Sequence, residues 1–175
     1  KEPGKHAYAS SGTGGIGHMQ TELFKSLTGL DMQHIGYKGA GPALNDVVAG
    51  QVPIMFDNLP SALPFIKAGQ LRAIVVASSE RVKAIGDIPT FKEVGLEPVN
   101  RMAYYGILAP KGTPKEVVDK VHAAAKKALE EPAVKKRIEE TGSLIVGNTP
   151  EEFSKQIKDE FNVYKEVVQK QKLTL

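Results

Sequence analysis

The chain has 175 residues, of which 41% are hydrophobic and 25% are charged, with a formal net charge of +3 and no cysteine. A chain of this length can bury one hydrophobic core, or one core and part of a second. The lack of cysteine excludes disulfides and thiol chemistry. No apolar run reaches the roughly 20 residues that a membrane helix needs. The lysines of the last third alternate with glutamates, which is typical of a solvated helix face and not of a nucleic-acid-binding patch.

Short apolar strands alternate with helices in the first half of the chain. Residues 6–9, 32–37, 52–56 and 71–77 are predicted to be strands, the last two almost wholly apolar, as buried parallel strands are. Each strand except the last is followed by a loop and a helical pattern. The helical positions are Ile16, Met19, Leu23, Phe24 and Leu27 before Gly29, then Leu44, Val47 and Val48, then Ala62 to Ile66. This order predicts an α/β fold with a parallel sheet covered by helices.

The pattern becomes less regular beyond residue 77. Residues 78–98 contain many glycines and prolines and are predicted to be irregular, apart from a short helix near 91–94. Residues 102–108 are the last strong strand candidate. A change of domain is predicted near Pro110.

Three helices are predicted in the carboxy-terminal third. Residues 113–116 and 149–152 both read Thr-Pro-x-Glu, a capping box with proline at the first helical position. Between these two boxes, residues 132–140 predict a helix and 143–146 a short strand. The final helix is expected to bury Phe153, Ile157, Phe161, Tyr164 and Val168.

The candidate binding site lies beyond the carboxyl ends of the predicted strands, where open α/β sheets bind ligands. Three loops meet there, at residues 10–14, at residues 38–41 and at Asp57 with Asn58. Glycine-rich loops that lead into helices present backbone N–H groups to an anion, and hydroxyls add donors. One such loop can be no more than a tight turn, but two at one sheet edge favour an anion site. Asp57 either contacts a ligand amino or hydroxyl group or caps the next helix, and both interpretations stay open.

The first loop also fits the dinucleotide fingerprint G-x-G-x-x-G, with Gly12, Gly14 and Gly17 between a strand and a helix. That fingerprint requires an acidic residue near the end of the second strand, to hold the ribose. The second strand ends at residues 35–38 without an acid, and the nearest one, Asp31, precedes the strand. A nucleotide- or dinucleotide-binding enzyme domain is therefore the alternative hypothesis, and the weaker one.

The sequence shows no catalytic constellation and no metal site, and we expect no cofactor. The four histidines have no metal-ligand spacing, and neither a zinc-protease motif nor a nucleophile elbow occurs. His18 lies in the first turn of the helix behind the first loop, where a packing or capping residue is expected. We therefore expect a binding protein and not an enzyme.

Several segments together resemble one protein family. They begin at Tyr8 (Tyr-Ala-Ser-Ser-Gly), Glu22 (Glu-Leu-Phe-Lys-Ser-Leu-Thr-Gly), Tyr37 (Tyr-Lys-Gly-Ala-Gly-Pro-Ala), Met55 (Met-Phe-Asp-Asn-Leu-Pro-Ser-Ala-Leu-Pro) and Leu108 (Leu-Ala-Pro-Lys-Gly-Thr-Pro). In order and spacing they are similar to the solute receptors of tripartite tricarboxylate transporters, the Bug family. The similarity runs over essentially residues 1–175.

The resemblance implies a periplasmic receptor of the Venus-flytrap type, with one parallel-sheet lobe and an incomplete second lobe. Residues 5–105 would form the ligand-binding lobe, the family's domain two, and residues 106–175 the returning part of domain one. We expect the family's amino-terminal segment and signal peptide to lie outside this sequence. The implied partners are a small di- or tricarboxylate, or an amino-acid-like anion, and the membrane permease subunits of the transporter. We expect the isolated chain to self-associate, or to be disordered beyond about Pro110, since its domain-one elements lack their partners.

The resemblance also implies a binding site, because the family holds ligand carboxylates largely through loop backbone groups and water. The matching positions in this sequence are Ser10, Ser11, Gly12, Thr13, Gly39, Ala40 and Asp57. One departure is the aromatic pair Tyr104-Tyr105, where the family often has tryptophan. Recognition by backbone groups leaves the identity of the carboxylate unreadable from the side chains.

Overall fold

The computed structural model describes residues 4–174. Proximity of Cα atoms divides the chain into two compact units. The first unit comprises residues 1–103 together with 163–175, and the second comprises 104–162. The assignment of residues 5–105 and 106–175 to two family domains stays a prediction. No helix within residues 4–174 is both long enough and apolar enough to cross a membrane.

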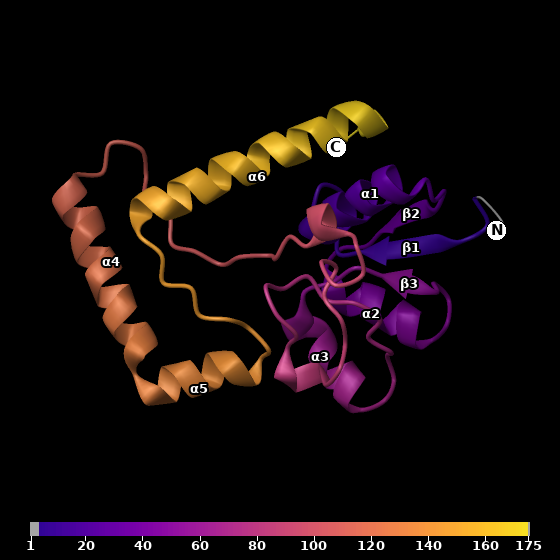
Figure 1. Ribbon diagram of the computed structural model, residues 1–175, viewed down its shortest axis with the longest axis horizontal. Coiled ribbons are helices and arrows are strands. Elements are labelled where there is room, and N and C mark those ends of the chain that lie inside the picture. Colours follow the sequence, from indigo (N-terminus) through magenta and orange to yellow (C-terminus); the bar gives the residue numbers. More distant parts are fainter. Residues whose placement is uncertain (1–3, 175) are drawn as a thin grey trace. The chain divides into compact units, whose positions relative to one another are not determined.

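A parallel sheet of three strands is the centre of the first unit (Figure 1). Its strands are β1 (Ala7–Ser10), β2 (Gln33–Gly36) and β3 (Ile54–Met55), in the order β2-β1-β3. Both neighbours run parallel to β1, with Tyr8 opposite His34 in β2. The first three predicted strands and the predicted α/β class are therefore confirmed.

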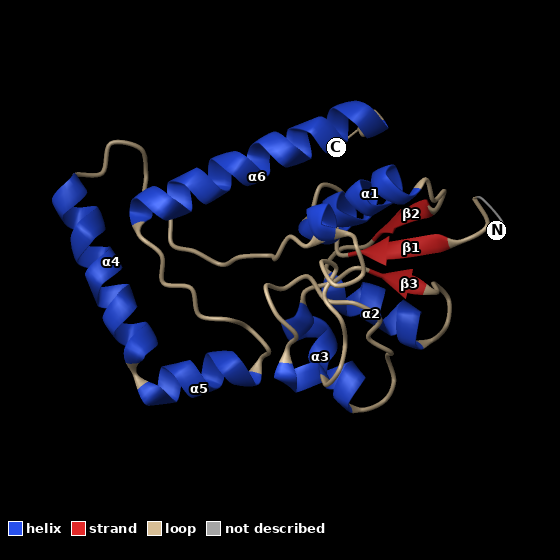
Figure 2. Cartoon of the chain, in the orientation of Figure 1, coloured by secondary structure: helices blue, strands red, loops and turns tan. Residues whose placement is uncertain are grey.

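Helices follow each of these strands (Figure 2). They are α1 (Ile16–Thr28), α2 (Ala40–Val48) and α3 (Leu59–Lys67), and two short 3₁₀ helices follow, η1 (Lys83–Ile85) and η2 (Glu97–Val99). Gly29 ends α1 in the left-handed conformation that its sequence predicts. The order of strands and helices is the predicted one.

The two faces of the sheet carry different cores because side chains alternate along a strand. On one face Ala9 packs with Ala43 of α2 and Val52. On the other, Met19 and Leu23 of α1 form the larger core. Its remaining buried members come from distant parts of the chain, namely Phe91, Val99 and Val167.

The second unit is mostly helical and has little buried surface. It contains α4 (Lys115–Glu130), α5 (Pro132–Glu140) and the first part of α6 (Pro150–Gln171). Neither α4 nor α5 has a buried residue. The large apolar side chains that are exposed in this unit are Tyr104, Tyr105, Ile107, Leu108, Val117, Val121, Val134, Leu144, Val146 and Phe161.

The end of α6 belongs to the first unit, where Val167 is buried in the core beside α1. Five positions of this helix are predicted to be buried. The prediction is wrong for Phe161, since 65% of its surface is exposed. The less exposed positions of α6 follow one stripe through residues 153, 157, 160, 164, 167 and 171, and Phe161 lies at the edge of this stripe.

Three predicted strands do not form. Residues 71–77 make only one isolated bridge, between Val76 and Thr90, and residues 102–108 and 143–146 make no strand pairing among residues 4–174. Apolar, β-branched sequence favours extended backbone, but a strand also requires a neighbouring strand to accept and donate hydrogen bonds. Within the described chain, these segments have no such neighbour.

The capping motifs differ in outcome. The box at 149–152 is confirmed, because the Thr149 N–H donates to Glu152 Oε2 at 2.8 Å and the Glu152 N–H donates to Thr149 Oγ1 at 3.2 Å. The box at 113–116 is wrong, because the Thr113 hydroxyl instead donates to the carbonyl of Pro110 at 2.9 Å. The predicted helix near 91–94 is only a turn.

Gly17 fixes how closely α1 approaches the sheet. A Cβ atom at this position would overlap the carbonyl oxygen of Phe56, directly after β3. Backbone atoms cannot move aside as a flexible side chain can, so only glycine fits here. The third glycine of the apparent dinucleotide fingerprint is thus accounted for by helix–strand packing.

Substituting Gly17 by alanine tests this contact. We expect Gly17→Ala to lower the free energy of unfolding by about 1–3 kcal/mol, because the new methyl group forces α1 away from Phe56. Gly41→Ala in α2 is the matched control, since a Cβ there meets nothing within 4 Å. Alanine in a helix should leave stability unchanged or raise it by up to about 1 kcal/mol. Urea unfolding monitored by circular dichroism distinguishes the two, and equal effects would contradict the packing role of Gly17.

Candidate functional site

The first loop leaves β1 at Ser10, and hydrogen bonds to the Ser10 side chain shape it. Ser10 is fully buried. Its Oγ accepts the Gly12 N–H at 3.3 Å and lies 2.7 Å from Nε2 of His34. Gly12 has a φ of 152°, a backbone conformation that residues other than glycine rarely adopt. The Ser10 hydroxyl therefore supports the loop from within.

The first loop is hydrogen-bonded to the second. The Gly39 N–H donates to the carbonyl of Ser11 at 2.9 Å, and the Tyr37 N–H donates to the carbonyl of Ser10 at 3.0 Å. Gly39 immediately precedes Ala40, the first residue of α2. Two of the three predicted loops thus form one continuous rim at the carboxyl end of the sheet, as predicted.

The side chains on this rim are polar and available. Thr13 is exposed, and Ser11 is partly exposed. Among residues 4–174, neither hydroxyl makes a hydrogen bond. The rim also includes the amino end of α1, whose first N–H groups have no partner within the helix. Such an arrangement of hydroxyls and N–H donors suits a small anion.

Asp57 follows β3 and lies next in the chain to Phe56, which contacts α1 at Gly17. Its Oδ2 is buried and has no hydrogen-bond partner among the described residues. Burial raises the pKa of Asp57, although the backbone N–H of Asn58 partly offsets this. The N-cap position of α3 is occupied by Asn58, so helix capping does not explain Asp57.

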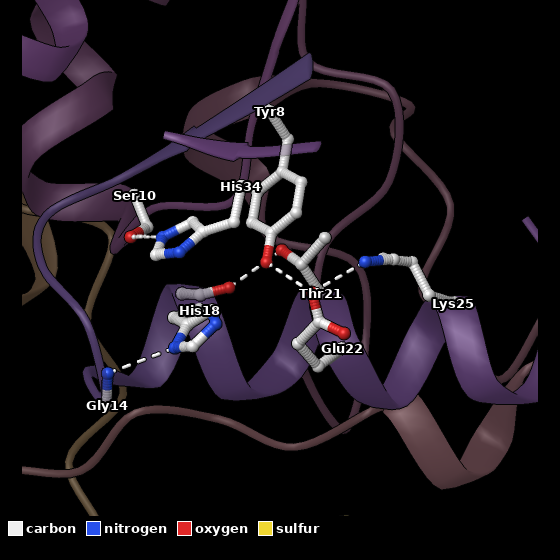
Figure 3. A network of polar contacts seen from close by, with 9 residues as sticks. Tyr8, Ser10, Gly14, His18, Thr21, Glu22, Lys25 and His34 are labelled. Atoms are coloured by element: carbon white, nitrogen blue, oxygen red, sulfur yellow. Dashed lines mark hydrogen bonds and ion pairs between the residues drawn. The ribbon is translucent and has the colours of Figure 1, made fainter. Parts of the chain in front are cut away.

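Two histidines lie behind the first loop (Figure 3). The rings of His18 and His34 are stacked, with centroids 3.9 Å apart and planes 11° from parallel. The Gly14 N–H donates to Nδ1 of His18 at 3.0 Å, and the His18 side chain is buried, which agrees with the predicted packing or capping residue. His34 was not predicted to have any role, yet it contacts Ser10 from the neighbouring strand.

A buried charged group lies below the histidines (Figure 3). The Tyr8 hydroxyl donates to Oε1 of Glu22 at 2.6 Å, and the Lys25 ammonium is 2.8 Å from the same oxygen. Burial, with the Glu22 hydrogen bond second, raises the pKa of Tyr8 far above its usual range. Tyr8 is therefore a permanent donor that satisfies the Glu22 carboxylate.

Burial also lowers the pKa of both histidines. For His18 the Glu22 carboxylate opposes this effect and Lys25 adds to it. For His34 the His18 ring lowers the pKa further. Both rings are consequently neutral near pH 7, and the histidine that accepts the Gly14 N–H carries its proton on Nε2.

The site offers hydrogen-bond donors and no reactive constellation. Within the described part of the chain, no three histidine, aspartate or glutamate side chains are grouped as metal ligands would be. The Tyr8, Glu22 and Lys25 side chains satisfy one another inside the fold. What remains at the rim is hydroxyls, N–H groups and the exposed Lys38 of the second loop, all of which suit the binding of an anion.

Comparison with known proteins agrees with this chemistry. Residues 1–173 match the family model described as the tripartite tricarboxylate transporter family receptor. The chain belongs to this receptor family. Members of this family are solute receptors and not enzymes, and none of the matches supports the dinucleotide-binding alternative.

The chain is also similar to individual receptors of this kind. BugT of Bordetella pertussis is 33% identical over 166 residues, which are 95% of this chain and 51% of BugT. A structure described as a periplasmic transporter is 50% identical, with a TM-score of 0.87 over 97% of this chain and 57% of the other. A protein of R. palustris solved with adipate is 29% identical, with a TM-score of 0.85 over 96% of this chain and 56% of its own. The chain has the receptor fold and spans about half the length of the relatives that it matches.

The hydrogen bond between Tyr8 and Glu22 is testable by removing one oxygen. We expect Tyr8→Phe to lower the free energy of unfolding by about 1.5–3 kcal/mol, because a buried carboxylate loses a donor. The matched control is Tyr37→Phe, where the hydroxyl donates to Asp46 at 2.7 Å in a more accessible place. Water can replace that donor, so a smaller loss is expected. Chemical unfolding at neutral pH measures both, and a larger loss for Tyr37→Phe would contradict this interpretation.

Proposed function

We propose that the chain is the ligand-binding part of a periplasmic receptor that captures a small carboxylate for a tripartite tricarboxylate transporter. The observation that carries the proposal is the continuous rim formed by the first two loops, where the Gly39 N–H binds the Ser11 carbonyl. The free hydroxyls of Ser11 and Thr13 and the start of α1 add donors along this rim. Membership of a receptor family supports the same function.

We assign the carboxylate contacts to the predicted positions in two groups. Ser11, Thr13 and Ala40 contribute donors from the rim, and Gly12 and Gly39, whose N–H groups donate within the loops, contribute through the shape of the backbone. Ser10 contributes through the shape of the loop, and Asp57 contacts a polar group of the ligand from the third loop. In this proposal residues 5–105 form the family's second domain, and residues 106–175 return to the first.

The proposal extends to ligand and partner. The adipate of the R. palustris relative is a dicarboxylate, and we propose a di- or tricarboxylate, or an amino-acid-like anion, for this receptor. The delivery partner is the permease in the membrane. No cofactor takes part.

Two measurements on the complete receptor test this function. Native mass spectrometry of the receptor as purified identifies an acid that it retains, and calorimetry against adipate, malate, succinate and citrate measures affinity. Saturable binding of one of these acids is the expected result. Saturable micromolar binding of NAD or NADP, with no acid bound, would overturn the proposal.

Removing one hydroxyl from the rim should weaken the binding. Ser11→Ala deletes a donor to a charged ligand group, a hydrogen bond worth about 1.5–3 kcal/mol, so the affinity should fall about tenfold or more. Ser79→Ala changes an exposed serine that lies outside the three loops and should have no effect. Calorimetry with the acid that binds best makes the comparison. A silent Ser11→Ala would move the site away from the first loop.

The isolated 175-residue chain should self-associate. Its second unit leaves apolar side chains of α4 uncovered, among them Val117 and Val121, and Phe161 of α6 is exposed as well. Exposed apolar surface of this extent promotes association. We expect light scattering after size-exclusion chromatography to give a mass above that of one chain. Phe161→Ser should shift the mass towards the monomer, whereas a wild-type monomer at all concentrations would contradict the prediction.

A further inference from the structure

The two histidines behind the first loop connect its beginning to its end. Nε2 of His34 lies 2.7 Å from Oγ of Ser10, where the loop starts. Nδ1 of His18 accepts the N–H of Gly14, immediately before the helix begins. The two rings are stacked with their centroids 3.9 Å apart (Figure 3). A movement of one ring would therefore disturb the other ring and the loop residue that it contacts.

The hydrogen bond from Gly14 defines the protonation state that this arrangement needs. Because Nδ1 of His18 accepts a hydrogen bond, it carries no proton. A second proton on this ring would have to bind at Nδ1, where it would face the Gly14 N–H. The hydrogen bond would then be lost, and the loop would lose its attachment at the end nearest to α1.

A charge on either ring is also unfavourable for the stack. An imidazolium would lie against the second ring and partly inside the fold, and burial disfavours a charged group there. The other charged or titratable groups that face the rings are Glu22 and Lys25 of α1 and Tyr8 of β1. Glu22 and Lys25 are paired with each other, so the carboxylate does not stabilise an imidazolium as a free one would.

We propose that His18 and His34 are positioning residues for carboxylate binding, whose stacked neutral rings hold Gly14 and Ser10 in the loop shape that binds the anion. This inference rests on the proposed function, because it concerns the same first loop. It assigns a role to two side chains that do not touch the ligand. It also makes the affinity dependent on pH through groups behind the site.

The sign of the pH dependence follows from the lowered pKa of both rings. The ordered loop requires neutral rings. When the loop loses its hydrogen bonds to the two histidines, an unfastened state, the rings can take up protons closer to their ordinary pKa of 6.5. Lowering the pH through this value therefore favours the unfastened loop. Affinity for the carboxylate should be full above the ordinary pKa and should fall as the solution becomes more acidic.

Paired variants separate the positioning role from simple packing. Asparagine at position 18 keeps an acceptor near the place of Nδ1, and leucine removes it. Glutamine at position 34 keeps a polar group near the place of Nε2, and leucine removes it. At about pH 7.5, His18→Leu and His34→Leu should each weaken binding about threefold to tenfold, whereas His18→Asn and His34→Gln should stay within about twofold of wild type.

The experiment uses the complete receptor and calorimetry with whichever of adipate, malate, succinate or citrate binds wild type most tightly. Between about pH 7.5 and about pH 5.5, wild-type affinity should fall about threefold or more, since one hydrogen bond to the loop is lost. The His18→Asn, His34→Gln double variant cannot take up these protons. Its profile should show only the titration of the acid itself, which makes it the control for the ligand.

The possible outcomes distinguish this inference from the proposed function. If wild type binds an acid but its pH profile coincides with that of the double variant, the positioning role is overturned and the receptor function stands. If wild type binds none of the acids, both are overturned. If the leucine variants fail to fold, the double variant and the pH profile still decide, because neither depends on leucine at these positions.

Discussion

The alternation of side chains along the central strand β1 is the constraint on which the rest of the structure depends. Ala9 points to the face covered by α2, where only a small side chain fits beside Ala43 and Val52. Tyr8 and Ser10 point to the opposite face, towards α1. A shift of the strand by one residue would move both polar side chains into the apolar core beside α2 and leave Ala9 facing the polar groups on the side of α1. The register of β1 therefore fixes the core, the buried Glu22 network and the loop together.

Much of this arrangement can be read from the sequence, and the reason is local. The first three strands and the order of helices α1 to α6 follow from the hydrophobic periodicity of the sequence. Residues such as Gly29, which end a helix, add the boundaries. The two glycine-rich loops could also be placed at one edge, because parallel strands end on the same side of a sheet. The three strands that do not form share a cause, since residues 71–77, 102–108 and 143–146 have strand composition without a partner strand in the described chain.

The histidine and glutamate network was not predictable from spacing alone. His34 meets Ser10 because β2 lies beside β1 in one particular register, and that register depends on tertiary packing. Glu22 is buried with two partners, whereas glutamate in an amphipathic helix is usually found on the solvent face. A signal was present in the polar Tyr8 and Ser10 of a strand with apolar neighbours, since a central strand rarely carries polar side chains without partners.

The same geometry explains how one loop can resemble a nucleotide-binding motif and serve another purpose. Gly17 is required by the carbonyl of Phe56, and Gly12 by its backbone conformation, so neither glycine depends on a pyrophosphate. What these glycines leave at the rim is a set of oriented N–H and hydroxyl donors, with the exposed Lys38 at the start of the second loop. Such donors recognise the carboxylate group and carry little information about the rest of the molecule. If the proposed function holds, discrimination among carboxylates comes from the shape of the space around the rim and not from these donors.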